Sequence, residues 1–270
     1  MPVKNVYLLD MGWLGGDIGW FLPGAGAMTY SDKSPKREWV LIPIMAAVVE
    51  HTDGYILFDT GISPDYMKTH QKGVIEAFPI EKFSDENRLE RQLALLNLKP
   101  EDISFVVLSH LHIDHVGQAS LFKDSKTPLI VQRKELEYAL TSLWMGKYGA
   151  YDPADLDPLR GANWVPIEEP SFELLDGIML EFTGGHTPGH QAMVVDVGNG
   201  KKFIFTGDFL HLPQELDLES KGWLLGDALE FENYVKRIKT RLVTKRYKLI
   251  ITHDPELWNK YPKAPKPIQW

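Results

Sequence analysis

The segment SHLHIDHVGQ, residues 109–118, places three of the chain's nine histidines and one aspartate within six positions: His110, His112, Asp114 and His115. Polar side chains packed this densely are costly to bury unless they pair with one another or bind a metal ion. Side chains alternate along an extended backbone, so His110 and His112 are expected to point to one side. A turn after Ile113 would direct Asp114 and His115 elsewhere, and the segment could then serve two metal ions.

Three more polar side chains follow apolar segments of strand type. His186 lies in FTGGHTPGHQ, Asp208 lies in FIFTGDF and His253 follows LIIT. Strand ends of a layered sheet meet at one rim, where ligands commonly bind, so these side chains are expected to join the first cluster. The chain has no cysteine, which excludes thiolate ligands, thiol nucleophiles and disulfides. Imidazole and carboxylate ligands favour zinc and also suit iron, manganese or cobalt.

The other histidines are weaker candidates. A lone histidine is more often a hydrogen-bonded polar residue than a ligand, and we interpret His51 and His70 as surface or loop residues. His190 follows His186 by four positions and is expected to order that loop rather than to bind metal.

Short apolar runs and helical periods must position these residues. Helical periodicity covers 85–98, 133–144 and 227–242, and Asp227 with Glu230 has capping-box spacing. Asn199-Gly200 predicts a hairpin. Strand-like runs cover 6–11, 39–51, 55–61, 105–110, 128–131, 172–177, 178–182, 192–198, 202–208 and 249–254. This pattern predicts the α/β class, with helices covering sheet faces.

Residues 14–37 and 145–168 are rich in glycine, proline and aromatic residues, and we predict irregular loops there. Long loops with apolar side chains are often binding loops. The alternative is that they simply pack on the core. As substrate contacts we predict Trp20, Phe21, Met28 and Tyr148.

Composition limits the function classes. The 270 residues suit one large domain or two small ones, and 44% apolar with 24% charged residues is ordinary for a globular protein. The net charge of −8 comes with no basic stripe, which argues against nucleic acid as a partner. No 18-residue apolar window and no signal-peptide pattern are seen, so a cytoplasmic protein without a membrane span is expected. A homodimer is compatible with the sequence but is not specified by it.

With these motifs the chain resembles the metallo-β-lactamase superfamily. HLHIDH is that family's His-x-His-x-Asp-His motif, and GGHTPGH, TGD and THD follow in the family's order, while LFDTG at 57–61 matches another of its stretches. The resemblance implies one hydrolase domain over residues 1–270, folded as an αββα sandwich with a dinuclear metal site at one edge. By position it assigns His110, His112 and His186 to one ion, Asp114, His115 and His253 to the other, Asp208 as the bridge, and Asp59 as an outer residue that orients a ligand.

Within the superfamily, the chain is most similar to the quorum-quenching N-acyl homoserine lactonases, through LLNLKPEDISFVVLSHLHIDHVGQ and its overall length. This resemblance implies that two divalent metal ions, zinc first, supply a hydroxide that opens the ring of a small lactone substrate. The alternatives are hydrolysis of another lactone, an ester or a phosphotriester, or a metal or redox protein without hydrolase activity.

One position departs from the lactonases. Many of them carry a tyrosine three residues after the bridging aspartate, where GDFLH places His211. The departure leaves either a substituted acid or a different substrate. Asp114 or His211 is expected to deliver the proton that the leaving alkoxide needs.

Overall fold

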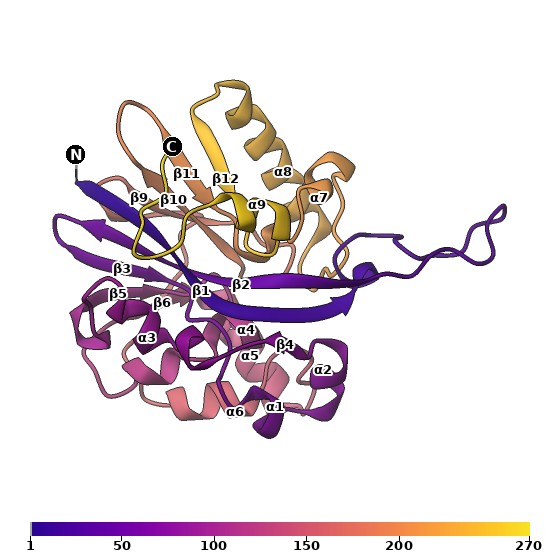
Figure 1. Ribbon diagram of the computed structural model, residues 1–270, viewed down its shortest axis with the longest axis horizontal. Helices are drawn as coiled ribbons and strands as arrows, with labels where there is room; N and C mark the ends of the chain where they lie inside the picture. Colours follow the sequence, from indigo (N-terminus) through magenta and orange to yellow (C-terminus); the bar gives the residue numbers. More distant parts are fainter. Residues whose placement is uncertain (1) are drawn as a thin grey trace.

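Two β-sheets, packed face to face, form the centre of the computed structural model, which describes residues 2–270 (Figure 1). The larger sheet has the strand order β4-β1-β2-β3-β5-β6-β7, and the smaller has the order β12-β11-β10-β9-β8. The strands are β1 (Val3–Asp17), β2 (Trp39–His51), β3 (Gly54–Phe58), β4 (Ile80–Lys82), β5 (Ile103–Val107), β6 (Leu129–Gln132), β7 (Trp164–Ile167), β8 (Ser171–Leu175), β9 (Ile178–Phe182), β10 (Gln191–Asp196), β11 (Lys202–Phe205) and β12 (Tyr247–Ile250).

Helices cover the outer face of each sheet, which gives the expected αββα arrangement. In Figure 1 the helices from α1 to α6 lie below the larger sheet, and α8 lies over the smaller one. The helices are α1 (Tyr66–Thr69), α2 (Lys72–Ala77), α3 (Leu89–Ala94), α4 (Ile113–Val116), α5 (Arg133–Trp144), α6 (Pro153–Leu156), α7 (Gln214–Leu218), α8 (Ala228–Val243) and α9 (Pro255–Lys260). Short 3-10 helices are η1 (Ile18–Trp20), η2 (Asp85–Asn87), η3 (Pro100–Asp102), η4 (Ala119–Phe122), η5 (Asp157–Leu159) and η6 (Gly207–Phe209).

Apolar side chains fill the space between the two sheets. Phe58 of β3 and Phe205 of β11 meet there with ring centroids 5.8 Å apart, and Met193 of β10 packs in the same cluster. The larger sheet is covered on both faces, which explains why β2 is a nearly continuous apolar run rather than an alternating one.

The sheet topology brings several strand ends to one edge. β3 and β5 are parallel neighbours, and so are β11 and β12. Parallel neighbours end on the same side of a sheet. Asp59 therefore follows β3 beside His110 after β5, and Asp208 follows β11 beside His253 after β12.

Some predicted boundaries agree with the structure, and others need correction. The strands at 39–51 and 178–182, the helix at 133–144 and the hairpin at Asn199-Gly200 are confirmed. The prediction of an irregular segment at 14–37 is wrong for its first part, because β1 continues to Asp17 and pairs with β2. At Gly15 a Cβ atom would lie 2.6 Å from Nε1 of Trp39, so glycine is needed for the cross-strand indole.

The second predicted loop, 145–168, also contains regular structure. Asp152 caps α6, and Pro153 occupies its first turn. β7 forms the edge of the larger sheet, where Pro166 is tolerated because an edge strand has unpaired N–H positions. The predicted helix at 85–98 divides into η2 and α3.

Among residues 2–270, we find no helix that combines the length and the apolarity needed to cross a membrane.

Candidate metal centre

The seven predicted metal ligands lie together at the sheet edge, and all of them are buried. The segment after β5 supplies His110 and His112, and α4 supplies the next two residues of the motif. The loop after β9, η6 after β11 and the turn after β12 provide the others. The complete set is His110, His112, Asp114, His115, His186, Asp208 and His253.

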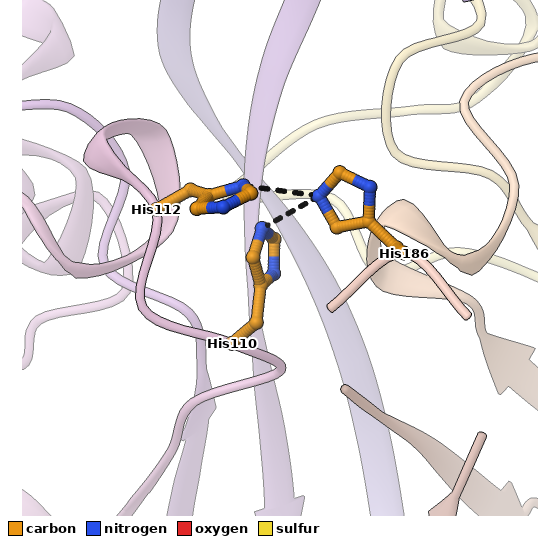
Figure 2. Close-up of side chains that lie close together, drawn as sticks. All are labelled: His110, His112 and His186. Carbon is orange, nitrogen blue, oxygen red and sulfur yellow. Dashed lines mark hydrogen bonds between the residues drawn. The ribbon is translucent and has the colours of Figure 1, made fainter. Parts of the chain in front are cut away.

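Three imidazole rings converge in the first half of the centre. Nε2 of His186 lies 3.2 Å from Nε2 of His110 and 3.0 Å from Nδ1 of His112, and Figure 2 shows the three rings pointing toward one another. Ring nitrogens gathered within one ion's reach are the arrangement that a divalent cation needs.

Asp208 joins this group to the second half. Its Oδ2 lies 3.4 Å from Nε2 of His186, while its Oδ1 lies 3.1 Å from Nε2 of His115 and 3.0 Å from Nε2 of His253. Asp114 Oδ2 lies 3.4 Å from Nε2 of His253. One carboxylate oxygen therefore faces each group, which is the geometry expected of a bridging residue.

Unpaired buried atoms test whether the residues fit metal ions. Nε2 of His115 and Oδ1 of Asp208 face each other, yet neither has a hydrogen-bond partner among the described residues, and Nε2 of His112 is also unpaired. Leaving a buried polar atom unsatisfied costs about 1–3 kcal/mol. A cation between these atoms would satisfy them, and this donor set of imidazoles and carboxylates suits zinc.

The pKa shifts of the three histidines in the first half of the centre agree with this fit. Burial lowers the pKa of His112 to about 3 and lowers the pKa of His110 and His186 well below the ordinary value. These rings are therefore neutral near pH 7, which is the form that binds metal. Burial alone would raise the pKa of Asp208, but the charges of His253 and His115 hold it well below its usual range.

Asp59 and Ser109 lie behind the candidate metal ligands. Asp59 Oδ2 is 2.8 Å from Nδ1 of His115, and the backbone N–H and the hydroxyl of Ser109 both donate to the Asp59 carboxylate. Asp59 has a φ of +58°, a left-handed conformation that aspartate tolerates better than most residues. A carboxylate behind a ligand fixes which imidazole nitrogen faces the metal.

Replacing Asp59 with asparagine is expected to weaken zinc binding by about 10–100-fold, as is typical when a carboxylate behind a ligand is lost. Chelator competition, with elemental analysis of the purified protein, measures this. Asp65→Asn, at an exposed carboxylate, is the matched control. Equal zinc affinity in the two variants would contradict an orienting role for Asp59.

His190, which we expect to order its loop rather than to bind metal, also lies behind the centre. Its Nε2 accepts the backbone N–H of Asp208 at 3.0 Å, and its Nδ1 lies 2.6 Å from the Thr183 hydroxyl. Both ring nitrogens are thus engaged, and the ring fixes the backbone of the bridging residue.

Sequence reasoning missed a buried carboxylate that holds two ligand loops together. Glu135, at the start of α5, accepts the N–H of Leu111 and the hydroxyls of Thr187 and Tyr151. It thereby joins the segment of His110 to the loop of His186. Its position in an amphipathic helix resembles that of an ordinary surface glutamate, so no local signal could have identified it.

A cavity of about 30 Å³ lies over the metal centre, roughly the space of one water molecule. His112, Asp114, His186, Asp208, His211 and His253 line its polar side. Leu14, Phe21, Ile42, Phe78, Ala150 and Trp223 form most of its apolar side. Several of these wall residues come from segments without any motif, so no local pattern could have selected them.

The four predicted substrate contacts differ in how close they lie to the cavity. Phe21 lines the cavity, and Trp20 packs on Trp223 with ring centroids 5.1 Å apart. Met28 is 69% exposed on the loop that projects from the body in Figure 1, and neither Met28 nor Tyr148 belongs to the cavity wall.

His211 lies in the cavity wall and is buried. Its Nε2 is 3.2 Å from Oδ2 of Asp208, and its Nδ1 is 2.9 Å from the Lys221 ammonium nitrogen. The position that departs from the lactonase pattern therefore faces the metal centre.

The interpretation of His51 and His70 as surface or loop residues is wrong for His51, which is buried at the end of β2, whereas His70 is buried but lies in the loop after α1. Nε2 of His51 lies 3.0 Å from the Asp176 carbonyl oxygen, and Nε2 of His70 lies 2.7 Å from Oδ2 of Asp155. These bonds connect distant segments and leave both histidines outside the metal centre.

Comparison with known proteins agrees with the motifs. The sequence pattern of the metallo-beta-lactamase superfamily matches residues 40–253. The N-acyl homoserine lactonase AttM of Rhizobium radiobacter is 28% identical, over 83% of this chain and 87% of its own length. The N-acyl homoserine lactonase of Bacillus cereus is 28% identical, over 80% of this chain and 82% of its own length. A solved N-acyl homoserine lactone hydrolase, with N-hexanoyl-L-homoserine at its catalytic metal centre, superimposes with a TM-score of 0.80 at 25% identity and covers 99% of this chain and 100% of its own.

Proposed function

Because this chain belongs to the metallo-beta-lactamase superfamily, we propose that it hydrolyses the lactone ring of N-acyl homoserine lactones, as a quorum-quenching enzyme. The observation that carries the proposal is the bridged cluster of seven buried ligands beneath a cavity with one apolar side. The lactonases of Rhizobium radiobacter and Bacillus cereus, which this chain resembles over most of its length, support the choice of substrate.

We propose zinc as the metal, with iron, cobalt or manganese as alternatives. His110, His112 and His186 would hold one ion, Asp114, His115 and His253 would hold the other, and Asp208 would contact both. Two such ions, when bound, supply a hydroxide at neutral pH and positive charge that polarises a carbonyl group.

Side chains of the protein can supply the proton that the departing ring oxygen needs. Ring opening adds hydroxide to the carbonyl carbon, breaks the acyl C–O bond and requires a proton on the departing ring oxygen. Asp114 and His211 both line the cavity, so either can reach a group bound there. A positioned acid of this kind contributes about 10²–10⁴-fold to the rate.

The acyl chain needs more room than the cavity provides. A groove of about 570 Å³ shares Ile42 with the cavity wall. Its apolar lining includes Ile18, Leu22, Val40, Leu212 and Pro213. We propose that the lactone ring binds over the metal centre and that the chain extends into this groove, whose wall residues Ile18 and Leu22 flank Trp20 and Phe21 in the sequence.

A panel of acyl homoserine lactones of increasing length tests the substrate, with unacylated lactones, esters and phosphotriesters beside them. Catalytic efficiency is expected to rise with chain length before levelling off, because each buried methylene contributes up to about 0.8 kcal/mol, or roughly fourfold. Faster hydrolysis of esters or phosphotriesters than of every acyl homoserine lactone would overturn the proposed substrate.

A pair of variants locates the acyl chain. Leu22→Ala should flatten the dependence on chain length because it removes part of the groove wall. Met28→Ala, on the exposed part of the same loop, is the matched change and asks whether Met28 takes part. An unchanged dependence on chain length in Leu22→Ala would place the chain outside the groove.

The whole chain, residues 1–270, would act as one hydrolase domain in the cytoplasm. Domain integrity can be read from a single unfolding transition, and location from cell fractionation.

A further inference from the structure

A buried ion pair lies behind His211, on the side away from the metal centre. The Lys221 ammonium nitrogen is 3.4 Å from Oε1 of Glu215, and neither side chain is exposed to solvent. The same nitrogen is 2.9 Å from Nδ1 of His211. Lysine and glutamate are almost never fully buried, even though they can be when paired. A buried Lys–Glu pair next to the metal centre therefore indicates a specific role.

We propose that Lys221 and Glu215 are positioning residues that hold His211 with its proton on Nε2, so that the ring presents a hydrogen-bond donor, and not a metal ligand, to the cavity. This inference deepens the proposed function and rests on it for the role of the donor in lactone opening. The assignment of the ring proton can be tested without any substrate.

The direction of the hydrogen bond from Lys221 determines which ring nitrogen of His211 carries the hydrogen. An ammonium group has three donors and no acceptor, so Nδ1 of His211 must offer its lone pair to Lys221. With Nδ1 accepting, the ring hydrogen lies on Nε2, which points to Oδ2 of Asp208 at 3.2 Å. The competing bond, from Nδ1 to Oε1 of Glu215, is longer at 3.4 Å.

The same contact decides between two chemical roles. His186, Asp208 and His211 lie close enough together to hold an ion by distance alone. A nitrogen that carries a hydrogen has no lone pair in the ring plane for a metal. The donor from Lys221 therefore excludes Nε2 of His211 as a ligand and leaves its N–H as a hydrogen-bond donor in the cavity wall.

Glu215 keeps Lys221 in place because the backbone holds the carboxylate. Glu215 accepts the N–H groups of His211, Leu212 and Gly222. Burial would raise the pKa of Glu215, but the charge of Lys221 outweighs it and keeps the pKa below the ordinary value, so the carboxylate is charged near neutral pH.

The chain segment of Lys221 is also fixed by packing. A Cβ atom at Gly222 would lie 2.6 Å from the backbone carbon of Phe21 and 2.7 Å from the carbonyl oxygen of Trp20. Glycine thus lets this segment approach the cavity wall closely. As a result, Lys221 lies behind His211. Trp223, two residues later, forms part of the cavity wall.

Long-range ¹H–¹⁵N NMR of the zinc-loaded wild-type protein, labelled at histidine, reads the ring proton directly. His211→Phe identifies the His211 signals by their loss. The expected pattern is hydrogen on Nε2 and none on Nδ1. Hydrogen on Nδ1, or a zinc-bound Nε2, would overturn the proposal whatever substrate the enzyme prefers.

Lys221→Met removes the donor and keeps the length and apolar character of the side chain. The hydrogen is expected to move to Nδ1, where Glu215 can accept it, with zinc content unchanged. Lactone kcat should fall by about tenfold or more while KM stays within about threefold, because the acid is lost and not the binding site. Lys68→Met, at an exposed lysine, is the matched control.

The outcomes separate the two proposals. A wild-type ring with hydrogen on Nε2 in a protein that hydrolyses no lactone would retain the proton assignment and reject the proposed function. An unchanged ring and an unchanged kcat in Lys221→Met would reject the role of Lys221. If this variant does not fold, the wild-type spectrum still decides the assignment.

Discussion

Replacing Asp208 with alanine is expected to abolish metal binding and lactone hydrolysis together. Its two carboxylate oxygens face different groups of imidazoles, with Oδ2 toward His186 and Oδ1 toward His115 and His253. The substitution removes a ligand from both ions at once. The loss of affinity should therefore exceed the roughly 10–100-fold that follows loss of a residue behind a ligand.

Elemental analysis after dialysis against zinc measures the result, with lactone turnover in the same samples. The wild-type protein is expected to hold two ions per chain, and Asp124→Ala, at an exposed aspartate, should match it. A variant that keeps two ions would contradict the bridging role. One ion or none in the wild-type protein would contradict the dinuclear centre itself.

The clustering of the seven candidate ligands could be predicted because its signals are local. The motif at residues 110–115 brings four polar side chains together before any tertiary contact forms. His186, Asp208 and His253 each follow an apolar strand, and the topology of the parallel strand pairs carries these strand ends to one edge. The αββα arrangement follows from the same pattern of strands and covering helices.

Residues whose roles depend on distant partners could not be found this way. The partner of His51 lies 125 positions away and that of His70 lies 85 positions away, so each had the local appearance of a surface residue. Glu135 and Lys221 are charged residues in polar stretches, and only the folded chain shows that they are buried. Local patterns do not report the tertiary bonds that stabilise a buried charge.

The prediction of an irregular segment at 14–37 was wrong for a related reason. Glycines at 15 and 16 normally interrupt a strand, but here they make room for the side chains of Trp39 and Phe21. β1 therefore continues to Asp17, and the aromatic residues that follow it, Trp20 and Phe21, reach the region of the cavity. Propensity alone cannot anticipate a glycine that is needed for packing.

Replacing His211 with phenylalanine is expected to lower lactone kcat by about tenfold to 10⁴-fold while both metal ions remain bound. Phenylalanine keeps a ring of similar size and removes both nitrogens. The seven proposed ligands are untouched, and the Lys221–Glu215 ion pair stays intact. The group that is lost is the donor on Nε2, which faces Asp208 across the cavity.

The choice of leaving group shows whether that donor acts as an acid. A lactone releases an alkoxide, which needs a proton, whereas a nitrophenyl ester releases a stable phenolate that does not. His211→Phe should therefore slow the lactone far more than the nitrophenyl ester. His211→Gln, whose amide N–H can occupy the place of Nε2–H, is the matched variant and should recover the hydrogen bond but not the proton transfer.

Each outcome assigns His211 to one role. Equal losses on both substrates, with partial rescue by glutamine, would make it a hydrogen-bond donor to the carbonyl oxygen rather than an acid. Loss of a metal ion in His211→Phe would make it a ligand and would contradict the proton assignment drawn from Lys221. A metal-replete variant with unchanged kcat would return His211 to packing against Phe21, whose ring lies 5.4 Å away, and would leave the proton to Asp114.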